Sequence, residues 1–204
     1  MGNRAVITTK ENFENNGVGV YLHWNGGRDS VEAFLKYCEI RDFRAPDDDN
    51  YGWARLVQVI SNFFGMDGLS IGIDVLSHLD CDNGDNGVYI IKGWEIVGRE
   101  YFNYEEQHSY EMNEMLHAID KCQPEPLGDY LDAEEVDVSS LKVGDKVYVK
   151  KWDKSIHVVE VKGFGDDMFV GGVNVKGLPF IPLVNDDRHN RNNYITSKTV
   201  RKAV

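Results

Sequence analysis

The sequence predicts a mixed α+β domain followed by a small all-β domain. In residues 1–122, strand-like and helix-like runs are mixed in the order ββααβββα, whereas residues 138–204 contain only short strand-like runs. Helices grouped early favour an α+β domain, because a doubly wound sheet needs strands and helices in regular alternation. Residues 123–137, "QPEPLGDYLDAEEVD", combine two prolines, a glycine and negative charge. They are predicted to be the linker between the two domains.

The strands of the first domain are predicted from β-branched and aromatic content. We expect them at residues 4–9, 18–23 and 69–75, and in a hairpin over 87–102. Polar residues 10–17 are predicted to form the turn between the first two strands. The hairpin is expected to reverse at a tight Lys92-Gly93 turn.

Three helices are predicted in the same domain, at residues 30–43, 50–64 and 109–122. Their apolar residues recur at helical spacing, as in Val31, Phe34, Leu35 and Cys38. For the first helix, Asp29 is expected to be the N-cap, with Glu32 completing a capping box. For the second, Gly65 stands where a C-cap glycine belongs.

The second domain contains five short strand-like segments in residues 138–204, beginning with "LKVGDKVYV", which has a turn at Gly144-Asp145. This number and size of strands resemble a small SH3-like barrel. The fold class predicted for the whole chain is therefore an N-terminal mixed α+β domain and a C-terminal SH3-like barrel. A fold of this kind does not by itself assign a function.

Charge is distributed unevenly along the chain, whose formal net charge is -12. Residues 1–123 contain 10 Lys and Arg against 21 Asp and Glu, residues 124–137 contain 6 acids and no base, and residues 138–204 contain 12 bases against 7 acids. An acidic surface repels nucleic acid and attracts cationic partners. The first domain is therefore expected to repel nucleic acid, and two partners are open to the basic second domain: nucleic acid or the acidic part of the chain.

No apolar run approaches the roughly 20 residues that cross a bilayer, and the N-terminal residues lack the apolar centre of a secretory signal. We therefore expect a cytoplasmic protein with no membrane contact. Three widely spaced cysteines, Cys38, Cys81 and Cys122, form no CxxC pair. Neither a disulfide framework nor a zinc site is predicted from them.

The stretch "YLHWNGGRDS" changes from a strand pattern to a helix pattern within a few residues. A helix start presents free N–H groups and favours negative charge, and glycines allow an anion to approach closely. This predicts an anion-binding candidate made of Asn25, Gly26, Gly27, Arg28 and Ser30, with His23 as a candidate acid or base. The alternative is a tight strand-to-helix turn in which Asp29 caps the helix and Arg28 is solvated. The stretch matches neither the P-loop nor the dinucleotide fingerprint.

A second cluster, "HLDCDNGDNG", contains Asp80, Asp82 and Asp85. Carboxylates at this density are candidates for calcium or magnesium, although their spacing is not that of an EF-hand. The alternative is a turn, because Asn, Asp and Gly accept left-handed conformations. We expect no metal and no cofactor. No GxSxG elbow is present, so the nucleophile of an α/β-hydrolase is not predicted. A binding protein is favoured over an enzyme, and the enzyme alternative stays open.

Three segments, "GVYLHWNGGRDSVEAFL", "YGWARLVQVISNFFG" and "LDCDNGDNGVYII", resemble an uncharacterised family of small acidic proteins from phages, prophages and plasmids of Gram-positive bacteria. The resemblance covers the first domain and not the barrel. Proteins of this genomic setting include counter-defence factors, among them anti-CRISPR inhibitors of Cas9-type nucleases. The resemblance therefore implies a counter-defence protein that acts in the bacterial host cell.

Two hypotheses from different classes follow. The first is macromolecular binding through the acidic domain that inhibits a host defence nuclease or nucleoprotein. The second is a phosphate- or nucleotide-binding enzyme or sensor that uses the Gly26-Gly27-Arg28 turn, with His23 transferring protons. A weaker possibility is nucleic-acid contact by the basic residues of the barrel, namely Lys142, Lys146, Lys150, Lys151, Lys154, Arg188, Arg191, Lys198, Arg201 and Lys202.

Overall fold

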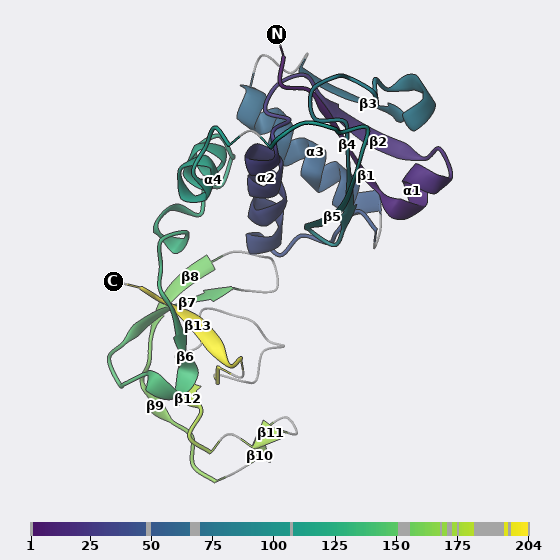
Figure 1. Cartoon of the computed structure of the whole chain (residues 1–204). Helices are drawn as coiled ribbons and strands as arrows, with labels where there is room; N and C mark the ends of the chain where they lie inside the picture. Colours follow the sequence, from purple (N-terminus) through teal and green to yellow (C-terminus); the bar gives the residue numbers. More distant parts are fainter. Residues whose placement is uncertain are drawn as a thin grey trace. The chain divides into compact units, whose positions relative to one another are not determined.

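The computed structural model describes residues 2–47, 50–65, 70–106, 108–150, 156–167, 169–170, 173–174, 176–181, 194–195 and 197–203. The chain divides into two compact units, Met1–Pro126 and Leu127–Val204. This division lies inside the segment predicted as the linker, residues 123–137. Each unit is described separately below (Figure 1).

The first unit is built on one five-stranded sheet in the order β3-β2-β1-β4-β5. Its central strands β1 and β4 are parallel, and the other neighbours are antiparallel. A mixed sheet with separate helices confirms the α+β prediction. The strands are β1 (Ala5–Thr9), β2 (Val18–Leu22), β3 (Ile71–Val75), β4 (Val88–Lys92) and β5 (Glu95–Glu100).

Four helices accompany this sheet: α1 (Lys10–Glu14), α2 (Arg28–Ile40), α3 (Asn50–Phe64) and α4 (Met112–Lys121). Figure 1 shows α2 and α3 on one side of the sheet, with α4 beside α2. Tyr37 of α2 donates a buried hydrogen bond of 2.7 Å to Asp120 of α4. A buried carboxylate needs a hydrogen-bond donor, and Tyr37 supplies it. The contact therefore links α2 to α4.

The segment predicted as a turn between β1 and β2 contains the short helix α1. The Thr9 hydroxyl caps it by accepting from the Asn12 backbone N–H at 3.4 Å. Threonine is a favoured N-cap because its oxygen satisfies a helix N–H that has no partner within the helix. The helix was missed because five residues are too few to show a helical period.

The core lies on both faces of the central strands. Ile7 pairs with Tyr89 in the sheet, and the Tyr89 hydroxyl donates to the Gly26 carbonyl just before α2. This face therefore packs against the helices. On the other face, Val6 and Val88 pack with Leu76 of the short helix η2 (Leu76–His78). Burial on both faces explains the uninterrupted apolar runs in β1 and β4.

The hairpin of β4 and β5 reverses one residue later than predicted. Lys92 pairs with Glu95, so Gly93 and Trp94 form the turn, and Gly93 has φ +61. The pairing register shifts between Ile90 and Ile91. A bulge of this kind changes which side chains face each other across the strands.

The second unit contains a four-stranded sheet in the order β6-β13-β7-β8 and the two pairs β9-β12 and β10-β11. Residues 135–137, predicted as part of the linker, form strand β6 in this sheet. Among the described residues no sheet closes on itself, so the SH3-like barrel is not confirmed. The elements are η3 (Gly128–Tyr130), β6 (Glu135–Asp137), η4 (Val138–Ser140), β7 (Lys146–Lys150), β8 (Ile156–Glu160), β9 (Gly163–Phe164), β10 (Phe169–Val170), β11 (Val173–Asn174), β12 (Pro179–Phe180) and β13 (Thr199–Ala203).

Four of the basic residues predicted to contact nucleic acid, Lys151, Lys154, Arg188 and Arg191, lie outside the described residues. In the part of the chain that the structure describes, no helix has the length and apolar character needed to span a membrane.

Candidate functional site

The Gly-Gly-Arg turn packs on the start of β1. The Gly26 N–H donates to the Asn3 carbonyl at 2.7 Å. A Cβ atom on Gly26 would lie 2.5 Å from that carbonyl oxygen and 2.7 Å from the Ala5 nitrogen. Only glycine fits this close backbone approach. Gly26 was predicted to leave room for an anion. In the structure the backbone at the start of β1 occupies that room.

The start of α2 already has a negative charge beside it, and it comes from Asp29. The N-cap is Gly27, not Asp29, so the predicted capping box is wrong. The Asp29 carboxylate accepts from Ser30 N at 2.7 Å, from Tyr110 N at 2.9 Å and from Ser109 N. A buried carboxylate fits a helix N-terminus, since the dipole there favours negative charge.

Arg28 is also engaged within the unit. Its Nε lies 2.7 Å from Glu32 Oε1, and its Nη1 lies 3.6 Å from Glu106 Oε1. The hydrogen bond to Glu32 is the main cause that raises the pKa of Arg28. Glu32 therefore forms an i,i+4 ion pair instead of the predicted capping contact.

His23 lies in the exposed stretch between β2 and the Gly-Gly-Arg turn. Its ring is 5.0 Å from the ring of Trp24 and 6.4 Å from that of Tyr21. Among the described residues no carboxylate or hydroxyl is hydrogen-bonded to the imidazole. The structure thus gives His23 no partner of the kind that orients a general acid or base.

The acidic loop before β4 is organised by a buried amide. Asn83, only 4% exposed, accepts from the N–H groups of Asp85, Asn86 and Gly87 at 3.0–3.1 Å. Gly84 and Gly87 have φ of +70 and +64. These contacts are those of a turn that needs left-handed residues.

The carboxylates of that loop lie against an arginine. Arg4 Nε is 2.7 Å from Asp85 Oδ2, and Arg4 Nη1 is 3.5 Å from Asp80 Oδ2. The hydrogen bond from Arg4 lowers the pKa of Asp85. Asp82 is exposed and does not join them. Across the described ranges, no group of three or more His, Cys, Asp or Glu side chains is arranged to hold a metal.

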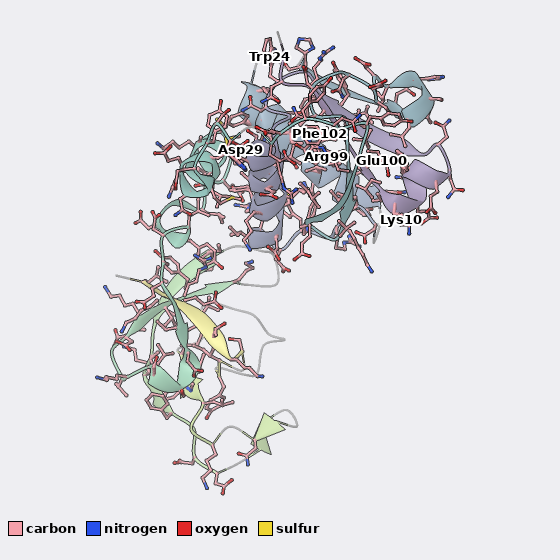
Figure 2. All side chains as sticks on the ribbon, viewed as in Figure 1. Lys10, Trp24, Asp29, Arg99, Glu100 and Phe102 are labelled. Atoms are coloured by element: carbon pink, nitrogen blue, oxygen red, sulfur yellow. The ribbon has the colours of Figure 1, made fainter. Side chains whose placement is uncertain are left out.

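Arg99 has a structural role that the sequence analysis missed. Its guanidinium carbon lies 3.7 Å from the ring centroid of Tyr89 and 3.9 Å from that of Phe102. Nη1 forms an ion pair with Glu106 at 2.8 Å, and Nε donates to the Asn86 carbonyl at 2.6 Å. Figure 2 shows Arg99 beside Phe102, and Asp29 at the N-terminal end of α2. Through these contacts Arg99 holds Phe102 and Glu106, which follow β5 in the chain.

We call residues 100–114, "EYFNYEEQHSYEMNE", the acidic tyrosine segment. It contains five Glu and no Lys or Arg. Arg99 holds its first part through Phe102 and Glu106, and Asp29 holds its second part through the backbone at Ser109 and Tyr110. Three of its tyrosines are exposed, Tyr101 by 50%, Tyr104 by 65% and Tyr110 by 49%. The segment is thus anchored while its tyrosine side chains are exposed.

A hollow of about 740 Å³ lies beside this segment. We call it the Glu106 hollow. Of the two predicted clusters, only the acidic loop lines it, through Asp85. Arg28 does not line the hollow, although it contacts Glu106, which does. Among the described residues its lining contains no Lys or Arg. The lining residues are Gly2, Asn3, Gly84, Asp85, Asn86, Phe102, Tyr104, Glu105 and Glu106.

The second unit has a hollow of its own, of about 590 Å³. Tyr130, Tyr148 and Tyr194 line it with Arg201. The Arg201 guanidinium lies 4.9 Å from the Tyr130 ring and donates to the carbonyls of Tyr130, Leu131 and Ala133. Arg201 is therefore held by the unit itself. Of the other basic residues named in the sequence analysis, Lys142, Lys146 and Lys198 are exposed, and Lys202 pairs with Asp145 at 3.0 Å.

Comparisons of the chain with protein-family models, curated proteins and solved structures found no match.

Proposed function

We propose that the protein is a mobile-element accessory protein that acts by macromolecular binding. In this proposal its acidic first unit binds a basic, nucleic-acid-binding surface of a host defence nuclease of the Cas9 type and inhibits it. The observation that carries the binding function is the acidic tyrosine segment, residues 100–114. The class of partner comes from the resemblance of the first-domain motifs to proteins of phages, prophages and plasmids.

The composition of the segment fits a protein-binding surface. Tyrosine is enriched where proteins meet, because its ring supplies a large contact area and its hydroxyl tolerates water. Single exposed apolar side chains are ordinary, but this segment has three exposed tyrosines within ten residues, Tyr101, Tyr104 and Tyr110. Arg99 and Asp29 hold the segment that carries these tyrosines. Binding therefore costs little additional backbone entropy.

The charge of the segment favours a cationic partner. Glu105, Glu111 and Glu114 are exposed, and the first unit is acidic as a whole. Grooves that bind nucleic acid are lined by Lys and Arg, and a negative protein surface competes for the same charges. Binding of this kind is accelerated by long-range attraction and weakens as salt is added.

Phosphate or nucleotide binding at the Gly26-Gly27-Arg28 turn has less support. It required Arg28 and the start of α2 to be available for an anion. Arg28 instead contacts Glu32 and Glu106, and the Asp29 carboxylate lies at the helix start. A phosphate brought there would meet a buried negative charge.

The second unit supplies a weaker contact with nucleic acid in this proposal. Lys142, Lys146 and Lys198 are exposed on it, and small basic β domains bind nucleic acid in this way. A small SH3-like barrel remains our prediction for this unit.

A cleavage assay tests the proposed function. Purified full-length protein is added to guide-loaded Cas9-type nucleases from several Gram-positive hosts, and DNA cleavage is measured at about 50 mM and about 300 mM salt. We expect at least one nuclease to be inhibited, and inhibition to weaken at the higher salt. If none is inhibited at either salt, the proposed function is wrong.

A pair of matched variants locates the surface. The triple substitution Glu105→Gln, Glu111→Gln and Glu114→Gln removes three charges from the acidic tyrosine segment. The control triple, Glu11→Gln, Glu14→Gln and Glu39→Gln, removes the same charge from exposed helical sites elsewhere in the unit. We expect the first triple to lose inhibition and the control to retain it. Equal losses would show that total charge, and not the segment, determines binding.

A further inference from the structure

We propose that the Glu106 hollow receives a cationic side chain of the partner, arginine or lysine, between the Tyr104 ring and the carboxylates of Glu105 and Glu106. The inference rests on the proposed function, because it names the group that the acidic unit recognises. It also states where on the unit that group is bound.

The lining of the hollow selects for positive charge. Three carboxylates, those of Asp85, Glu105 and Glu106, line it without any basic residue among the described ones. Asp85 is paired with Arg4, and Glu106 with Arg99. Glu105 is exposed and has no ion-pair partner in the described part of the chain. It supplies the charge that a ligand can neutralise.

The aromatic side of the hollow already holds one cation within the chain. Arg99 lies over one side of the Phe102 ring. Phe102 and Tyr104 meet edge to face, with ring centroids 6.1 Å apart and planes at 72°. Among the described residues no cation lies over the Tyr104 ring, which is 65% exposed. Arginine and lysine make cation–π contacts with such rings. Tyr104 can therefore bind a cation of the ligand in the way that Tyr89 and Phe102 bind Arg99.

Glu106 adds an acceptor that is not satisfied within the unit. Both Arg28 and Arg99 contact its Oε1, whereas its Oε2 is buried and accepts no hydrogen bond from the described residues. An unpartnered carboxylate oxygen is costly in a protein interior. A guanidinium or ammonium group in the hollow is attracted to the charge of this carboxylate, while Oε1 keeps its contacts with Arg28 and Arg99.

The size of the hollow matches such a ligand. Its volume of about 740 Å³ lies within the range of about 300–1,000 Å³ that is usual for small-ligand sites. One long side chain enters it with room for water. The hollow is therefore a recognition point for one residue of a partner, and the rest of the acidic tyrosine segment makes the wider contact.

Nuclear magnetic resonance of the full-length protein tests this inference. Backbone amide shifts are followed while N-acetyl-arginine amide or N-acetyl-lysine amide is added at constant ionic strength. The control ligand is N-acetyl-citrulline amide, which has the shape of the arginine compound but no charge. We expect saturable shifts at residues 84–86 and 102–106 with a cationic ligand, and none with the citrulline compound.

Two variants test the named side chains. Tyr104→Ala and Glu105→Gln are each expected to weaken the cationic ligand about fivefold, the effect of losing one cation–π or ionic contact of this size. Both residues are exposed, so the fold is retained, and the spread of the amide spectrum checks this. The matched controls are Tyr51→Ala, which alters another exposed tyrosine, and Glu11→Gln. We expect both to bind as wild type does.

Each outcome decides the inference. Shifts that are absent, lie elsewhere or are equal with citrulline overturn it, as do variants at Tyr104 and Glu105 that bind normally. If a nuclease is inhibited but the hollow binds no cation, this inference fails while the proposed function stands. If the hollow binds a cation but no nuclease is inhibited, the proposed function fails and the site remains.

Discussion

Replacing Arg99 with methionine removes the charge that fastens the acidic tyrosine segment and keeps a side chain of similar length. Arg99 is 13% exposed as a side chain and pairs with Glu106 at 2.8 Å. It also lies between the rings of Tyr89 and Phe102. Breaking a buried ion pair by removing one partner costs about 3–5 kcal/mol. We take the lower end, about 3 kcal/mol, because Glu106 keeps Arg28 at 3.6 Å.

Amide hydrogen exchange is the assay, since it reports the local opening of residues 100–110 separately from the second unit. A loss of about 3 kcal/mol corresponds to exchange about 100-fold faster in the variant. The control Arg99→Lys keeps the charge but loses the planar stacking and the hydrogen bonds to Asn86, and should cost about 1 kcal/mol. Exchange in Arg99→Met within about threefold of wild type would refute this account of how the segment is held.

Three further outcomes are expected. Gly26→Ala should destabilise the first unit by about 1–3 kcal/mol, because the added Cβ would lie 2.5 Å from the Asn3 carbonyl oxygen. The control Gly72→Ala should be tolerated, because its nearest neighbouring atom is 3.6 Å away. Equal changes in melting temperature for the two variants would contradict this. Arg4 lowers the pKa of Asp85, so the stability from that carboxylate is present above its unfolded pKa of about 3.9 and is lost as pH falls through the lowered folded pKa. Asp85→Asn should therefore flatten the acid side of the stability profile, and an unchanged profile counts against the Arg4 contact. Burial raises the pKa of the Cys38 thiol, whereas Cys122 is exposed. A thiol reagent should therefore label Cys122 first, and Cys122→Ser should lose this fast phase of labelling. Rapid labelling of Cys38 in the native protein would contradict the packing of α2.

Where local signals agreed, the sequence predicted the fold well. The bounds of α3 were found because its apolar period is continuous and Gly65, at φ +60, ends it in the conformation that glycine favours. The strands of the first unit were also found, since their composition differs from that of the turns. The order of strands in the sheet was not predicted, because pairing β1 with β4 depends on contacts between distant parts of the chain.

The anion at the start of α2 shows why the site was only partly predicted. The physical expectation of a negative charge there was sound. The charge is that of Asp29, and the donors Ser109 and Tyr110 that share it lie 80 and 81 residues further along the chain. A local motif cannot reveal a partner at that separation. The same holds for Asp85 and Arg4, which are 81 residues apart.

The role of Arg99 was missed because the predicted turn implies a different pairing between β4 and β5 from the one observed. A turn at Lys92-Gly93 would place Tyr89 opposite Ile96. The observed turn at Gly93-Trp94 and the register shift between Ile90 and Ile91 place Tyr89 opposite Arg99. A shift of this size changes every cross-strand pair, so a small error at the turn hides the contact that fastens the acidic tyrosine segment.

The most direct test of the central claim is the dissociation constant of the full-length protein for a guide-loaded Cas9-type nuclease, measured against salt. For wild type we expect tight binding at low salt and a steep loss of affinity as salt rises. For the triple variant Glu105→Gln, Glu111→Gln and Glu114→Gln we expect weak binding and a shallower salt dependence. Affinity that is the same in both proteins, or that does not respond to salt, would contradict recognition through the acidic tyrosine segment.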